Sequence, residues 1–135
     1  MGSFDVTVVA EPQYLRVTTI GNYAFPELFG FLTRVREEAE TADKDKVLID
    51  SRLLVGNMTE AERFQGGQKI AELFGSRIKV ALLMPAEQIT KLGELVASNR
   101  GGKFHVTPSE SEGLNWLLEM PEDDETDRRP ANRIL

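Results

Sequence analysis

The stretch from Asp50 to Thr59 contains the residues whose types and spacing could do chemistry. It follows the apolar run 47–49 and leads into a helical pattern, so it joins the carboxyl end of a strand to the start of a helix. Ligands of open α/β sheets usually bind at that edge. The candidate binding residues are Asp50, Ser51, Arg52, Asn57 and Thr59 in this stretch, and Phe64, Gly66 and Gly67 in the helix that follows.

Two interpretations of this stretch stay open. The first helical amides after Thr59 could hold an anion, although Glu60 and Glu62 already complement the helix dipole. Asp50 could contact a ligand, or it could accept loop amides and pair with Arg52. A lone carboxylate without a partner acid or base is a poor basis for acid–base catalysis, so no catalytic residue is expected.

The Gly66-Gly67 pair lies inside a predicted helix, where each glycine costs roughly 1 kcal/mol relative to alanine. Close packing of this helix on a neighbour would explain the pair. The alternatives are a ligand that touches the backbone or a kink that exposes a groove.

The chain of 135 residues has no cysteine and one histidine. These counts exclude thiolate and multi-histidine metal sites, so no metal or cofactor is expected. No G-x-G-x-x-G or G-x-S-x-G motif occurs. His105 lies in a short β-type run and is expected to be structural and half-exposed; a hydrolase would need it within hydrogen-bond reach of Asp50. The chain is therefore not expected to be an enzyme.

The net charge of −6 argues against binding to nucleic acid or to an anionic membrane. No apolar run approaches the roughly 18 residues of a membrane span, and the start MGSFDV is unlike a signal peptide, which favours a cytoplasmic location.

Half of the excess negative charge falls in residues 119–135. We therefore expect one domain over residues 1–120 and a disordered tail of acidic and basic residues over 121–135.

Hydrophobic periodicity predicts the elements that position these residues. Strands are expected near 4–8, 15–19, 47–49, 78–84 and 104–106, and helices near 24–41, 59–74, 86–99 and from Thr107 onward. The second helix runs through the apolar residues Ala61, Phe64, Ile70 and Ala71. Thr59 and Glu62 form a capping box, and Gly75 ends that helix. The order β-β-α-β-α-β-α-β-α predicts an α/β fold: a mostly parallel five-stranded sheet with an antiparallel first hairpin strand, covered by helices.

Four segments together resemble a known family. They are KVLIDSR at 46–52, KVALL at 79–83, KFHV at 103–106 and GLNWLL at 113–118. With the order of elements, they resemble the short stand-alone bacterial branch of the SpoIIAA-like or STAS-like family, over roughly residues 3–120. The resemblance implies the SpoIIAA-like fold and a non-enzymatic regulatory or protein-interaction module.

The wider family includes anti-sigma-factor antagonists that are switched by phosphorylation of a serine at the start of the second helix. The matching stretch here, 57–61, contains no serine, and a phosphate on Thr59 would lie beside Glu60 and Glu62. We expect a protein partner bound by the face of the 50–60 loop and the second helix. The alternative is a small apolar or lipid ligand between the first two helices, lined by Phe25, Phe29 and Phe64. A homodimer is plausible because small sheets leave edges to cover.

Overall fold

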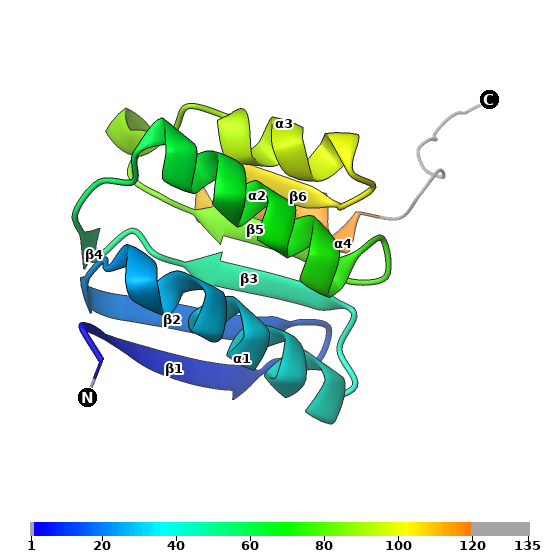
Figure 1. Ribbon diagram of the computed structural model, residues 1–135. Helices are drawn as coiled ribbons and strands as arrows, with labels where there is room; N and C mark the ends of the chain where they lie inside the picture. Colours follow the sequence, from blue (N-terminus) through cyan, green and yellow to red (C-terminus); the bar gives the residue numbers. More distant parts are fainter. Residues whose placement is uncertain (1, 120–135) are drawn as a thin grey trace.

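The computed structural model describes residues 2–119; the expected tail at 121–135 lies outside the described residues. The sheet follows the order β1-β2-β3-β5-β6, and a two-residue strand, β4, also pairs with β2 (Figure 1). Its strands are β1 (Phe4–Ala10), β2 (Leu15–Asn22), β3 (Lys46–Asp50), β4 (Leu54–Val55), β5 (Lys79–Leu83) and β6 (Phe104–Thr107). Only the β1–β2 pair among these is antiparallel. This topology confirms the predicted mostly parallel sheet.

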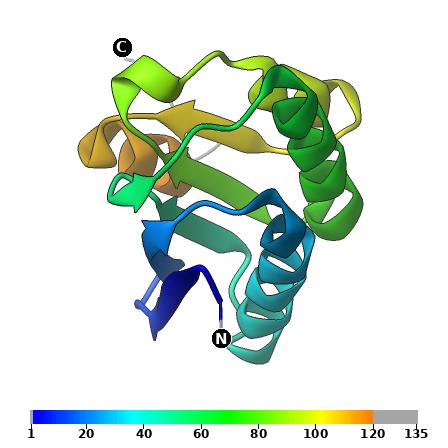
Figure 2. The ribbon, with the colours of Figure 1, turned by 60° about the vertical axis from the view of Figure 1, so that its left-hand side comes forward.

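Helices cover the two faces of the sheet unequally. Helices α1 (Leu28–Thr41), α2 (Glu60–Phe74) and α3 (Leu92–Asn99) lie on one face, and α4 (Glu110–Leu118) lies on the other (Figures 1 and 2). Alternate residues of β3 face the two sides: Val47 and Ile49 enter the core beneath α1 and α2, whereas Leu48 packs toward α4. Helix α4 contacts mainly β3, β5 and β6, so in the described part of the chain much of β1 and β2 carries no helix on that side.

Three helix starts differ from the sequence prediction. A 3₁₀ turn at Phe25–Glu27 precedes α1. The predicted helix over 86–99 is a 3₁₀ turn, Ala86–Gln88, followed by extended Ile89, left-handed Lys91 with φ of 69°, and only then α3. The hydroxyl of Ser109, rather than Thr107, caps α4 by accepting a hydrogen bond from the Glu112 amide.

The inner face of α2 is built partly from glycines. Ala61 and Phe64 are exposed, Phe64 by 41%, so Phe64 contributes to the surface. Gly66 and Gly67 are buried instead, together with Ile70 and Phe74. The helix thus presents its glycines to its neighbours, as the packing interpretation of the pair required.

The two ends of the sheet are finished differently. At β6, the outward backbone of Val106 is occupied by two side chains: Lys91 Nζ donates to its carbonyl oxygen, and Glu94 Oε1 accepts from its amide at 3.1 Å. At the other end, β1 pairs with β2 alone within the described part of the chain. None of the helices between residues 2 and 119 has the length and apolar character of a membrane span.

Candidate functional site

The 51–59 segment leaves β3 and enters α2 at the edge of the sheet where the parallel strands end, as predicted. Its first residues form an ion cluster. Arg52 donates from Nε to Asp50 Oδ1 at 3.0 Å and from Nη2 to Asp50 Oδ2 at 2.9 Å. The Arg52 amide also donates to Asp50 Oδ1. The pairing interpretation of Asp50 is therefore confirmed.

Two further residues, distant in sequence, complete the cluster. Arg16 on β2 lies 3.6 Å from Asp50 and 3.0 Å from Glu110 on α4, and Glu110 also pairs with Arg52 at 3.1 Å. Burial raises the pKa of Asp50, but the hydrogen bonds from Arg52 and the charge of Arg16 lower it more, so it lies below its ordinary value. The cluster is balanced, with two cations against two anions.

Ser51 turns to the opposite side of the sheet from Asp50. Its Oγ lies 2.7 Å from Thr19 Oγ1, and the two residues are 9% and 1% exposed. A kinase could not reach the Ser51 hydroxyl in this conformation. Thr59 is exposed, but its hydroxyl accepts from the Glu62 amide while Glu62 accepts from the Thr59 amide, which confirms the capping box.

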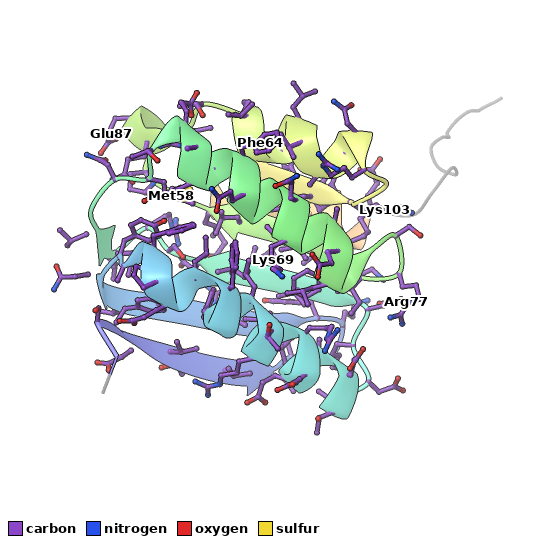
Figure 3. The ribbon with its side chains drawn as sticks, in the orientation of Figure 1. Met58, Phe64, Lys69, Arg77, Glu87 and Lys103 are labelled. Carbon is purple, nitrogen blue, oxygen red and sulfur yellow. The ribbon has the colours of Figure 1, made fainter. Side chains whose placement is uncertain are left out.

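The remaining predicted site residues separate into surface and core. Asn57 is exposed, and Phe64 lies on the α3 side of α2, where the Arg100 guanidinium is 5.9 Å from its ring centre (Figure 3). Gly67 is packed against α3: a Cβ there would lie 2.5 Å from the carbonyl oxygen of Gly93. Gly66 and Gly67 are both buried beneath neighbouring helices, and both line an internal cavity.

An exposed apolar patch next to the ion cluster was missed in the sequence. Leu53 and Val55 are 67% and 64% exposed, while Leu54 between them faces inward. Pairing of β4 with β2 brings Ile20, which is 50% exposed, beside them. Ile20, Leu53 and Val55 form what we call the Ile20–Val55 patch. Its only signal in the sequence is the run Leu53-Leu54-Val55 in a loop.

A cavity of about 110 Å³ lies between the α1–α2–α3 face and the carboxyl ends of the strands. Its walls are mostly apolar, and include Phe31, Leu32, Ile49, Ile70, Leu82 and Phe104. Exposed Gly56 and Thr90 also line it, so it reaches the surface between the 51–59 segment and the segment 85–91. Phe25, Phe29 and Phe64 do not line it; the groove predicted from them is not this cavity.

Arg63 connects the two segments that border the cavity. From α2 it donates through Nη1 to the carbonyl oxygen of Met58, and through Nη2 to that of Gln88 at 2.7 Å. Met58 lies at the start of α2 (Figure 3). Tyr23, also on the cavity wall, donates to Glu62 at 3.1 Å; burial and this bond both raise the pKa of Tyr23.

Asp50 and His105 do not form the pair that a hydrolase would need. His105, half-buried on β6 as expected, stacks on Trp116 and places Nδ1 3.3 Å from Glu94 and Nε2 3.1 Å from Glu112. Asp50 is on β3, with β5 between them. Among the described residues, no group of three His, Asp or Glu side chains could hold a metal ion.

Comparison with known proteins supports the fold. No protein-family model matches the sequence, and no curated protein matches it. An anti-sigma factor antagonist from Mycobacterium paratuberculosis superposes with a TM-score of 0.57 at 12% identity, over 87% of this chain and 96% of that one. An uncharacterized protein of the DUF3478 family with a SpoIIAA-like fold, from Shewanella loihica PV-4, gives 0.53 at 19%, over 85% and 93%. The chain thus has the SpoIIAA-like fold that the resemblance implied.

Proposed function

We propose that the chain is a regulatory protein-interaction module that binds a partner protein through the Ile20–Val55 patch. The observation that carries this proposal is three large aliphatic side chains, each at least half exposed, on a part of the sheet that none of the helices within residues 2–119 covers. Adjacent exposed aliphatic side chains are a mark of interaction sites. The likeness of the fold to an anti-sigma factor antagonist supports the same class of function.

The surroundings of the patch match the anatomy of an interface. Interfaces place apolar side chains at the centre and charged ones at the rim. Arg52, the residue before Leu53, is 36% exposed and is held by Asp50 and Glu110 in one orientation. A side chain fixed in this way loses little conformational entropy when a partner binds. Asn57 and Thr59 extend the exposed segment toward α2.

Photo-crosslinking in cells tests the proposal. A photoreactive amino acid at position 53 is expected to capture one partner protein in high yield. The double variant Leu53→Ser/Val55→Ser in a pull-down should lose that protein while keeping the melting temperature within a few degrees, because both side chains are exposed.

Val9→Ser is the matched control, since Val9 is 46% exposed on β1 outside the patch. It should retain the partner. Equal capture by all three proteins, or a crosslinker at position 53 that captures nothing above the yield at position 9, would refute the proposal. A crosslink to a second copy of the chain would identify the patch as a homodimer interface instead.

We propose small apolar-ligand binding as the second candidate function. The cavity favours it, because apolar cavities of this order can bind small apolar molecules. Its volume is far below that of a whole lipid, so only a short chain or one ring could enter. Native mass spectrometry of the chain purified without detergent should then find a bound small molecule in addition to the bare chain.

A further inference from the structure

On the sheet side of the mostly apolar cavity wall, one position carries two buried hydroxyl groups. On β2, Leu15 and Val17 precede Thr19 on the same face, and on β3, Val47 and Ile49 precede Ser51. The next inward-facing residues on the two strands are therefore Thr19 and Ser51. Their hydroxyl groups lie opposite one another where the strands border the cavity. Apolar side chains there would continue the core on both strands.

The hydroxyl pair has one proton more than its own hydrogen bond uses. Thr19 and Ser51 carry two O–H protons, and the bond of 2.7 Å between their oxygens uses one, whichever group donates. Among residues 2–119, neither hydroxyl has another hydrogen-bond partner. Both side chains are at least nine-tenths buried and line the cavity. The second proton is therefore available to an acceptor inside the cavity.

The cationic residues that line the cavity, Arg63 and Lys91, are already paired. Arg63 is bound to the carbonyl oxygens of Met58 and Gln88 and to Glu60. Lys91 is bound to Glu94 and to the carbonyl oxygen of Val106. An anion in the cavity would have one hydroxyl donor and no free cation, which is too little to offset its loss of hydration. A neutral ligand has no such cost.

We infer that this cavity binds a neutral apolar molecule with one acceptor oxygen, a ketone, ester or alcohol, whose oxygen accepts the free proton of the Thr19–Ser51 pair. The inference rests on the second candidate function and adds to it the chemical class of the ligand and the two residues that select it. The apolar body lies against the aliphatic and aromatic walls, and the carboxyl-end segments 51–59 and 85–91 border its entrance.

A matched set of five-carbon probes tests the inference: pentan-2-one, pentan-1-ol, n-pentane and pentanoate. Binding is followed by methyl chemical shifts of Ile49, Ile70 and Ile89 in the full chain. The ketone and alcohol should bind roughly three- to tenfold more tightly than the alkane, the range for one neutral hydrogen bond. Pentanoate should bind most weakly.

The double variant Thr19→Val/Ser51→Ala removes both hydroxyl protons and should abolish the preference for the oxygen-bearing probes, whereas either single variant still leaves one free donor. Thr18→Val is the control: it is the same substitution on the next residue, which faces the other side of the sheet. Equal affinity for ketone, alcohol and alkane in the wild type, or an unchanged preference in the double variant, would overturn the inference and leave apolar-ligand binding intact. Failure of every probe to shift the methyl signals would overturn both.

Discussion

Gly67 on α2 and Gly93 on α3 touch backbone to backbone. A Cβ at position 67 would lie 2.5 Å from the carbonyl oxygen of Gly93 and 3.1 Å from the Cβ of Val96. Backbone cannot rotate out of the way as the end of a flexible side chain can, so any larger residue at 67 must separate the two helices.

We predict that Gly67→Ala lowers the free energy of unfolding by about 1–3 kcal/mol, the usual cost of overpacking. Chemical denaturation measures it. Gly30→Ala is the control, because no atom lies within 4 Å of a Cβ at that position in α1. That variant should be as stable as the wild type or up to about 1 kcal/mol more stable. If Gly67→Ala also left the free energy of unfolding unchanged, that result would contradict the close backbone contact between α2 and α3.

Replacing Arg63 should loosen both segments that border the cavity. Arg63→Ala removes the donors for the Met58 and Gln88 carbonyl oxygens at once. We expect faster amide hydrogen exchange at 52–58 and at 86–91 together, and a lower melting temperature. Arg77→Ala is the control, since the Arg77 side chain is 74% exposed (Figure 3). Faster exchange in only one segment would contradict a shared attachment.

The Asp50 cluster predicts a defined pH dependence of stability. Because the folded-state pKa of Asp50 lies below its ordinary value of about 3.9, the carboxylate contributes stability above that value, and the contribution is lost as the pH falls through the folded-state pKa. Asp50→Asn should destabilise the protein by about 1–3 kcal/mol near pH 7. The free energies of unfolding of the wild type and of Asp50→Asn, measured by denaturation, should converge as the pH falls below 4. A gap that is constant from pH 7 to 3 would count against the ion pairs.

The capping box at Thr59 gives a local prediction. Thr59→Ala removes the acceptor for the Glu62 amide and should cost about 1 kcal/mol. Thr59→Ser keeps the hydroxyl and should restore most of that stability, as thermal unfolding of both variants would show. Equal losses in the two variants would mean that the methyl group, rather than the cap, is responsible.

Sequence periodicity predicts the order of elements because each long segment has enough residues for its period to show. The 47–49 and 78–84 runs carry buried residues on both faces of the sheet, and their apolar character identifies them as central strands. Strand β4 has two residues, Leu54 and Val55, too few for any pattern. The break before α3 depends on the left-handed backbone conformation of Lys91. A lysine in the sequence does not predict that conformation.

The site was partly predictable for the same reason. The pairing of Asp50 with Arg52 is local and follows from their spacing. Arg16 and Glu110 join them across 94 residues of sequence, through the register of β2 on β3 and the position of α4. The buried side of α2 was harder to predict, because Gly67 faces inward only where α3 approaches α2 closely, and that approach joins distant segments.

The unequal ends of the sheet limit how copies of this chain could join through their strands. Head-to-tail growth into a filament needs two different free edges on each copy, so that one edge pairs with the preceding copy and the other with the following copy. At β6, Lys91 and Glu94 occupy the outward backbone of Val106, so a strand arriving there would have to displace both. An incoming copy would meet that obstacle only at β6. If two copies pair through their β1 strands, the result is a symmetric dimer in which both β1 edges are occupied. The side chains on β6 therefore act as a stop against open-ended polymerisation.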